Sequence, residues 1–122
     1  MILVDTSVWI DHFHHTDNEL VRLLDNAMVL QHPLVVGELA LGALRDRDRI
    51  IDLLRNLPAA PVASHDEVLH FVDTYRLYGR GLSLVDAHLL ASVLLAPGAT
   101  LFTRYRRLDA MAHELGLPRT VS

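Results

Sequence analysis

An apolar run at the amino terminus, Ile2-Leu3-Val4, leads directly to the carboxylate of Asp5, and two hydroxyl residues follow it. Short runs of aliphatic and β-branched residues bounded by polar ones are typical of strands buried on both faces, as in the middle of a parallel sheet. Open α/β sheets bind their ligands beyond the carboxyl ends of the strands. Asp5 is therefore expected at a functional site, although Asp is equally a preferred cap for a following helix.

The length and composition of the chain indicate one domain with a hydrophobic core. Its 122 residues suffice for a single domain but not for two. Apolar stretches such as 89–96 are far shorter than the roughly 20 residues of a membrane span, and the chain begins with a strand, not a signal peptide. The chain has no cysteine, which excludes disulfides and thiolate chemistry and fits a reducing compartment. We therefore expect a cytoplasmic protein with no membrane segment.

The charge of the chain argues against a protein that coats nucleic acid without specificity. The formal net charge is −4, whereas general phosphate binding needs a basic surplus. All 11 basic residues are Arg, however, and eight of them cluster within 45–49, 76–80 and 104–107. The planar guanidinium group suits phosphate. Tyr75 and Tyr78 beside the second cluster are compatible with a groove for RNA or a partner, but charge runs more often mark a solvated surface.

The remaining sequence alternates strand and helix patterns. Thr16, Ser64 and Ser83 each stand three residues before an acid, which is the spacing of a capping box. The patterns predict helices over 8–13, 16–26, 33–44, 47–57, 64–79, 83–96 and 107–115, and strands over 2–4, 29–30, 62–63 and 100–103 with an edge strand near 120–121. The helix after Ser83 has a predicted apolar face of Leu84, Ala87, Leu90, Ala91 and Leu94. This order predicts an α/β fold of three layers, with a mostly parallel sheet of four to five strands flanked by helices.

Three acidic residues stand in apolar neighbourhoods at places that suit a site. Asp5 closes the first strand, Glu38 lies on the helix after the second strand, and Asp86 lies in the first turn of its helix. Buried carboxylates need a partner, and their mutual repulsion raises pKa values unless a cation neutralises them. Oxygen ligands select Mg²⁺ or Mn²⁺ over zinc. Each acid also has an alternative role, since Asp86 can complete a capping box with Ser83 and Glu38 can pair with Arg45.

Four short motifs in this order resemble those of PIN-domain ribonucleases, specifically VapC-type toxins. They are Val-Asp-Thr-Ser-Val at 4–8, Pro-Leu-Val-Val-Gly-Glu at 33–38, Leu-Val-Asp-Ala at 84–87 and Leu-Phe-Thr-Arg at 101–104. The likeness covers essentially the whole chain, 1–122, as one PIN-like domain. It implies a hydrolase, an endoribonuclease toxin that depends on Mg²⁺ or Mn²⁺ and cleaves RNA phosphodiester bonds. It also implies a homodimer that a cognate VapB-like antitoxin inhibits.

The resemblance also implies roles for individual residues. Asp5, Glu38 and Asp86 match the catalytic carboxylates that bind the metal ion. Hydroxyl residues beside them orient water or ligands in such sites. The candidates for this supporting role are Thr6, Ser7 and Thr103.

One position departs from the family pattern. In the family, a further Asp usually stands two residues after the Thr that corresponds to Thr103. This chain has Tyr105 at that position. A phenol with a pKa of about 10 is a poor Mg²⁺ ligand at neutral pH. Asp109, four residues later, is the candidate that compensates. The alternative to an active nuclease is therefore a catalytically weakened or inactive PIN-like module that binds RNA or an antitoxin.

Overall fold

A small parallel sheet lies at the centre of the computed structural model, which describes residues 1–120. Its strands are β1 (Ile2–Val4), β2 (Val29–Leu30) and β3 (Thr100–Phe102). The strand order is β2-β1-β3, and Ile2 pairs with Val29 on one side and with Thr100 on the other. The first strand is thus the central one, as predicted. Its carboxyl end is flanked by the carboxyl ends of both neighbours.

The strand predicted over 62–63 is wrong. The chain pairs with the end of β2 earlier, where Gln31 and Ala59 form an isolated parallel bridge. The amide of Gln31 donates to the carbonyl of Pro58 at 2.8 Å. Pro61 follows closely and lacks an N–H group, so it cannot extend a ladder of hydrogen bonds. The pairing therefore stops after one bridge.

The predicted edge strand near 120–121 is present only as a bridge between Leu101 and Arg119. The amide of Thr120 donates to the carbonyl of Leu101 at 2.7 Å, and Val121 lies outside the described residues. Pro118 accepts a hydrogen bond from the amide of Leu101 but has no N–H group to return one. Over residues 1–120 the sheet consequently has three strands, not the four to five predicted.

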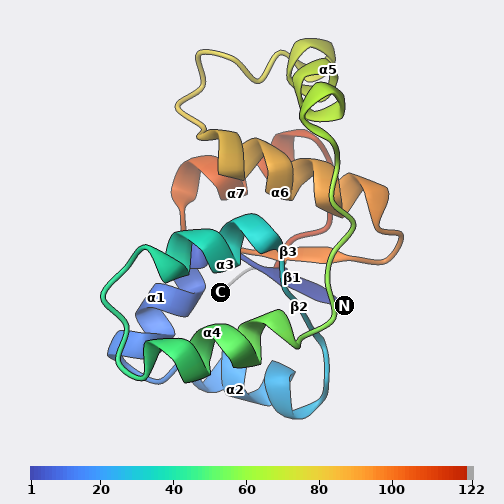
Figure 1. The fold of residues 1–122 in the computed structure, drawn as a ribbon. Coiled ribbons are helices and arrows are strands. Elements are labelled where there is room, and N and C mark those ends of the chain that lie inside the picture. The colour runs from blue at the N-terminus through green and yellow to red at the C-terminus, as the bar shows by residue number, and fades with distance from the viewer. Residues whose placement is uncertain (121–122) are drawn as a thin grey trace.

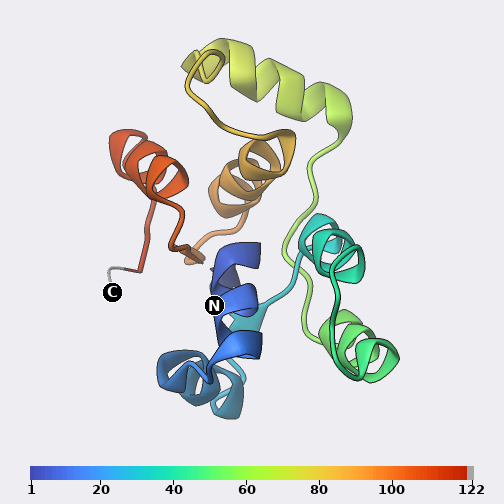
Figure 2. The same cartoon turned by 90° about the vertical axis from the view of Figure 1, so that its left-hand side faces the viewer.

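Seven helices surround the sheet in the described part of the chain. They are α1 (Thr6–His14), α2 (Asn18–Asp25), α3 (Pro33–Ala40), α4 (Arg47–Arg55), α5 (His65–Tyr75), α6 (Leu84–Leu95) and α7 (Arg106–Glu114). Helices α5, α6 and α7 gather on one side of the sheet, with α2 and α4 on the opposite side (Figures 1 and 2). Helices α3 and α4 contact each other as a helical hairpin. The arrangement confirms an α/β fold with helices flanking a parallel sheet.

Several helix ends differ from the sequence prediction, including the start of α1, which lies at Thr6 and not at residue 8. The N-cap of α2 is Asp17, whose side chain accepts a hydrogen bond from the amide of Leu20 at 2.9 Å. The predicted capping box at Thr16 is therefore wrong, and the helix begins one residue later. A carboxylate at the cap also favours the positive end of the helix dipole. Helix α3 ends at Ala40, well before the predicted end at Leu44. The residues after Ala40 form a turn that leads into α4.

Helix α5 ends at Tyr75 and not near Gly79, because Arg76 adopts a left-handed conformation with φ of 54°. Two glycines in the connection to α6 also have positive φ, 70° at Gly79 and 77° at Gly81, where glycine is favoured. We call residues 75–82, which include this turn, the strap. The strap is drawn in yellow beside α5 in Figure 1.

Helix α6 is buried around most of its circumference. Every residue of the segment 86–93 is buried, whereas Leu84 and Leu94 are 51% and 49% exposed. The prediction of a single apolar face is therefore wrong, because its first and last residues, Leu84 and Leu94, are half exposed. Neighbouring elements cover several sides of α6 instead of one stripe. Within residues 1–120, no helix has the length and apolar character needed to cross a bilayer.

Candidate functional site

Asp5 follows β1 at the middle of the edge where the parallel strands end. Its side chain is only 5% exposed. Oδ2 accepts hydrogen bonds from the hydroxyl groups of Ser7 and Thr103, each at 2.7 Å. Asp5 is also the N-cap residue of α1, but its side chain caps no backbone amide. The backbone of Asp5 thus begins the helix, while its carboxylate faces the side chains that follow β1 and β3.

Two backbone amides orient these hydroxyl groups. The amide of Arg104 donates to Ser7 Oγ at 3.1 Å, and the amide of Tyr105 donates to Thr103 Oγ1 at 3.0 Å. Because each hydroxyl oxygen accepts an N–H, its own hydrogen remains free to donate to Asp5. Asp5 Oδ1 accepts no hydrogen bond from within residues 1–120. The carboxylate is therefore held by one oxygen and open at the other.

Asp86 is the third residue of α6 and completes the capping box with Ser83. The Ser83 amide donates to Asp86 Oδ2 at 2.9 Å, and the Asp86 amide donates to Ser83 Oγ at 3.1 Å. Burial raises the pKa of the Asp86 carboxyl, the hydrogen bonds from Ser83 oppose this, and the negative charges of Asp5 and Glu38 raise it further. Asp86 thus serves as a helix cap and lies within electrostatic reach of both other acids.

Glu38 lies on α3 at the border of the same region. Its side chain is exposed, and Oε1 accepts a hydrogen bond of 2.6 Å from the hydroxyl of Thr6. Thr6 is the neighbour of Asp5 and the first residue of α1, so this bond joins α3 to the end of β1. No ion pair connects Glu38 to Arg45 in residues 1–120. The structure thus brings Asp5, Glu38 and Asp86 into one region.

Tyr105 and Asp109 have their own partners. The hydroxyl of Tyr105 donates to the carbonyl of Gly81 at 3.1 Å. Asp109 forms a bidentate ion pair with Arg119, whose Nη1 lies 3.0 and 2.9 Å from its two carboxylate oxygens. The side chain of Tyr105 therefore fastens the strap, and that of Asp109 ties α7 to the end of the described chain.

Comparison with known proteins identifies the family. The family model described as PIN domain matches residues 2–114. The chain belongs to the PIN-domain family. Two curated relatives, both named Ribonuclease VapC32, come from Mycobacterium tuberculosis strains CDC 1551 / Oshkosh and ATCC 25618 / H37Rv. Each is 55% identical over 117 residues, which cover 96% of this chain and 94% of the relative. This PIN domain is therefore of the VapC type.

PIN-domain nucleases are typically metal-dependent, and the acidic residues of this PIN domain fit a hard cation by their chemistry. Asp5, Glu38 and Asp86 each hold one oxygen in a hydrogen bond and leave the other without a donor from residues 1–120. The pKa of Asp86 is raised first by burial and then by the negative charges of Asp5 and Glu38, and a cation bound among the acids would offset both effects. As they lie, no three Asp, Glu or His side chains in residues 1–120 are close enough to enclose one ion. The donor set suits Mg²⁺ or Mn²⁺, and closure around an ion requires side-chain movement.

The sequence does not predict which hydroxyl group bonds to which acid, or what Tyr105 contacts. The sequence leaves Thr6 and Ser7 as equivalent candidates, whereas the structure pairs Ser7 with Asp5 and Thr6 with Glu38. No sequence pattern indicates that Tyr105 contacts Gly81. The only signal was the turn formed by two glycines around Arg80, which predicts flexibility and not a contact.

Two buried histidines lie on the elements that carry two of the acids. His32 is fully buried and caps α3, because its Nδ1 accepts a hydrogen bond from the amide of Leu34 at 3.1 Å. His88 on α6 is 8% exposed, and the two ring centroids are 6.0 Å apart. Burial, and then the charge of His88, lower the pKa of His32 from 6.5 to about 4. His32 is therefore neutral at physiological pH.

This neutrality predicts a pH dependence of stability. The unfolded chain binds a proton on His32 below pH 6.5, but the folded chain does not until about pH 4, so stability falls as the pH falls between these values. The shift corresponds to at most about 3 kcal/mol. His32→Asn keeps a cap acceptor without titrating, so its urea-unfolding free energy should change less between about pH 7 and pH 5. The exposed His14→Asn should behave as wild type. A pH dependence of His32→Asn equal to that of wild type would contradict this assignment.

Proposed function

We propose that this chain is a VapC-type endoribonuclease that hydrolyses RNA phosphodiester bonds with the help of a divalent metal ion. The observation that carries the proposal is the grouping of Asp5, Glu38 and Asp86, in which the pKa of Asp86 responds to the charges of the other two. The names of the 55% identical relatives support ribonuclease activity. The position of Asp5 at the carboxyl end of the central strand agrees with the usual place of ligand sites in open α/β sheets.

In this proposal, the three carboxylates would hold Mg²⁺ or Mn²⁺, and each has one oxygen that accepts no hydrogen bond from residues 1–120. When bound, such a cation would supply Lewis acidity toward a phosphate oxygen and toward water. Asp5 and Asp86 are buried and fixed, whereas Glu38 is exposed and has room to turn toward them. Thr6, Ser7 and Thr103 orient the carboxylates, as hydroxyl groups around metal ligands do.

Tyr105 favours one alternative, a PIN-like module that binds RNA or an antitoxin without cleaving RNA. The usual acid is missing at this position, and the compensating candidate Asp109 is already neutralised by Arg119. The nuclease proposal therefore requires that Asp5, Glu38 and Asp86 suffice. The two functions differ in whether the protein binds a divalent cation.

The direct test incubates the purified chain with a mixed RNA in Mg²⁺, in Mn²⁺ and in EDTA. Cleavage in either metal and none in EDTA is the expected result, because the cation supplies both phosphate polarisation and an acidic water. Calorimetric titration with Mn²⁺ should show binding. Absence of both cleavage and Mn²⁺ binding would reject the nuclease and favour the binding module, and gain of Mn²⁺ binding in Tyr105→Asp would identify the cause.

The antitoxin belongs to the same proposal. A groove of about 490 Å³ separates α1 from the helical hairpin, with Ile10, Phe13, Leu39 and Ile50 among its apolar lining residues and Glu38 at its border. An antitoxin segment with apolar residues would fill this groove. An Arg on that segment would pair with Glu38 and replace the charge of the metal ion, which accounts for inhibition.

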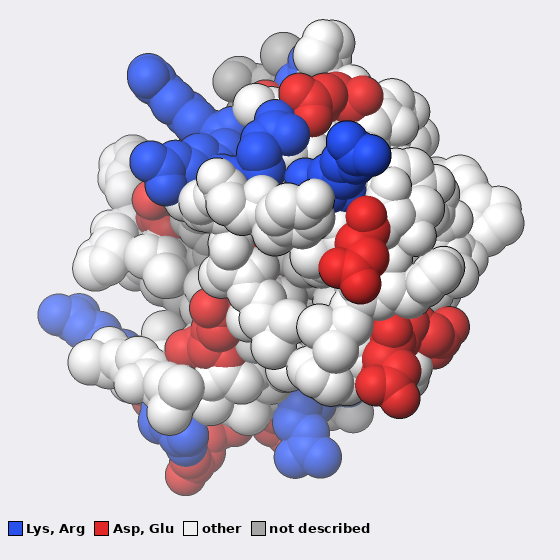
Figure 3. Space-filling model, turned by 90° about the horizontal axis from the view of Figure 1, so that it is seen from above, with Lys and Arg blue, Asp and Glu red and all other residues white. Residues whose placement is uncertain are grey.

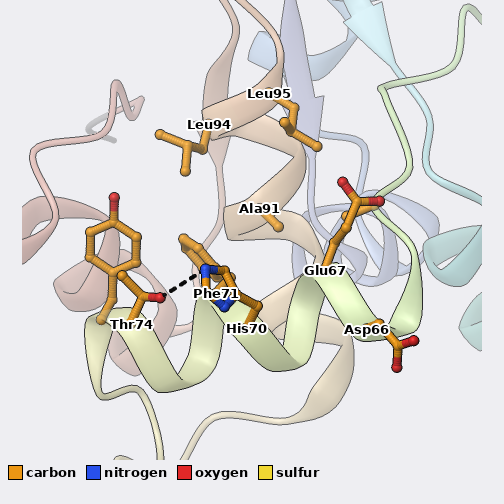
Figure 4. A pocket seen from close by; sticks show the side chains of 10 residues that line it. Asp66, Glu67, His70, Phe71, Thr74, Ala91, Leu94 and Leu95 are labelled. Carbon is orange, nitrogen blue, oxygen red and sulfur yellow. Dashed lines mark hydrogen bonds between the residues drawn. The ribbon is translucent and has the colours of Figure 1, made fainter.

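We also propose that the protein is a homodimer, as the resemblance implies. A second groove, about 500 Å³ in volume, lies between α5 and α6. Leu94 and Leu95 project toward it from α6, and Phe71 faces it from α5 (Figure 4). Leu94 and Leu95 are about half exposed, at 49% and 48%, so a second copy would remove apolar surface from water. Sedimentation of a 13.7 kDa monomer at micromolar concentration would argue against the dimer.

A further inference from the structure

The strap is fastened to α7 at the position where the chain departs from its family. The hydroxyl of Tyr105 donates to the carbonyl of Gly81. The guanidinium of Arg107 lies directly against Gly81, so closely that a β-carbon at that residue would collide with it. The strap and the first turn of α7 therefore form one continuous surface.

Two further contacts hold the strap in place. Leu77 is buried, with 3% of its surface exposed, and anchors the strap in the core. Arg80 forms an ion pair of 3.0 Å with Glu114 at the end of α7. A segment held at several points loses little conformational freedom when it binds a ligand.

Basic residues are concentrated in the strap and at the start of α7, where Arg80 pairs with Glu114 and Arg104 pairs with Asp11 and Asp17. The strap contains two Arg and no acid, and residues 104–107 contain three Arg and no acid, in a chain whose net charge is −4. Arg76, Arg106 and Arg107 are exposed and form no ion pair within residues 1–120. Seen from the side of α5, several basic side chains gather in the upper part of the view, and others lie at its left and lower borders (Figure 3). These guanidinium groups keep their donors available for an anionic ligand.

Aromatic side chains accompany the positive charge. All three tyrosines of the chain belong to these two segments. Tyr75 also lines the groove between α5 and α6, so the rings free of the proposed dimer contact are Tyr78 and Tyr105, which are 63% and 38% exposed. Exposed rings interspersed with Arg are the combination that binds single-stranded nucleic acid, because rings stack on unpaired bases while guanidinium groups hold phosphates. A double helix keeps its bases stacked and offers none to a tyrosine ring.

The same surface adjoins the acidic site. Beyond Leu82 the strap continues into Ser83, whose amide donates to Asp86. On the other side, the amide of Tyr105 donates to Thr103, which in turn donates to Asp5. The strap therefore borders residues that hydrogen-bond to Asp5 and Asp86.

We propose that the strap and the first turn of α7 bind single-stranded RNA beside the acidic site. Arg76 and Arg107 hold backbone phosphates, and Tyr78 stacks on an unpaired base. The inference rests on the proposed nuclease function for the identity of the substrate. The strap also gives Tyr105 a role of its own, because its hydroxyl positions Gly81 and, with it, the surface on which Arg107 lies.

The test measures binding of a fluorescent single-stranded RNA by anisotropy in EDTA, where no metal-dependent cleavage occurs. Arg76→Gln/Arg107→Gln should weaken binding at least about 10-fold at low salt and reduce the slope of log affinity against log salt by about 1.4, the value for two phosphate contacts on a single strand. Tyr78→Ala should weaken binding about 5-fold or more. The matched control Arg49→Gln/Arg55→Gln removes two exposed charges from α4, on the far side of the molecule, and should leave the affinity within about 2-fold.

The outcomes separate this inference from the nuclease proposal. If wild type cleaves RNA but Arg76→Gln/Arg107→Gln binds RNA as tightly as the control variant does, the proposed RNA-binding role of the strap is wrong. The nuclease proposal would stand in that case. If the strap variants bind RNA more weakly but wild type does not cleave it, the RNA-binding role of the strap is supported and the nuclease proposal is rejected. A duplex RNA bound as tightly as the single strand would overturn the single-strand assignment. If Arg107→Gln disturbs folding, Arg76→Gln/Tyr78→Ala tests the same surface, since both side chains are exposed.

Discussion

Asp5→Asn is expected to lower metal-dependent RNA cleavage by at least about 100-fold. Asn has the same shape as Asp, and its carbonyl oxygen can still accept the hydrogen bonds of Ser7 and Thr103, so the fold should persist. The substitution removes the charge at the centre of the site. The remaining carboxylates should then hold Mn²⁺ weakly, because electrostatic attraction to a divalent ion depends on the number of anionic ligands.

Cleavage on a denaturing gel and Mn²⁺ titration by calorimetry should be measured on the same preparation. The exposed Asp25→Asn at the end of α2 is the matched control and should retain wild-type activity. Undiminished cleavage by Asp5→Asn would show that the reaction takes place elsewhere. Lost cleavage with unchanged Mn²⁺ affinity would remove Asp5 from the ligands and leave it as a positioning residue.

Asp86→Asn is expected to lower metal-dependent RNA cleavage by at least about 100-fold, as for Asp5→Asn. In the absence of metal, the same substitution is expected to stabilise the protein. Burial and the charges of Asp5 and Glu38 raise the pKa of Asp86, so the folded protein binds this proton more tightly than the unfolded chain. Stability without metal therefore falls as the pH rises above the ordinary carboxyl value of 3.8. Asn carries no charge and avoids this loss, while its side-chain oxygen can still accept from the Ser83 amide.

Thermal melts near neutral pH should rank the melting temperatures of wild type and Asp86→Asn in opposite order with and without Mn²⁺. Without metal, Asp86→Asn should melt above wild type, and with saturating Mn²⁺ only wild type should gain stability, because a ligand stabilises the state that binds it. The exposed Asp73→Asn on α5 should follow wild type in both conditions. A lower melting temperature of Asp86→Asn without metal would mean that the capping role of the carboxylate outweighs its repulsion by the other acids.

Local patterns were sufficient where one segment carries its own signal. The apolar run before Asp5 predicts a buried central strand, and that strand lies between both neighbours. The capping boxes at Ser64 and Ser83 are formed, because their partners lie only three residues away. Local signals failed for the strand over 62–63, since prolines limit the hydrogen bonds that a neighbouring strand can receive.

Much of the acidic region could likewise be anticipated from residue type and order. Asp5 follows the first strand, Glu38 lies on the helix after the second strand, and Asp86 lies in the first turn of its helix. Parallel strands bring such positions to one edge of the sheet. The partners of each carboxylate could not be anticipated. Ser7 and Thr6 are adjacent in the chain, yet they bond to different acids because successive helical side chains point in different directions.

The amino-acid sequence by itself determined the α/β class, the central first strand, the capping boxes at Ser64 and Ser83 and the family, because these depend on short-range patterns and residue identity. Only the tertiary structure decided that the Asp5 carboxylate faces Ser7 and Thr103 instead of capping α1, and that Tyr105 fastens the strap. Thr103 lies 98 positions from Asp5, and Gly81 lies 24 positions from Tyr105. Contacts over such separations depend on how the whole chain packs, which no local pattern encodes.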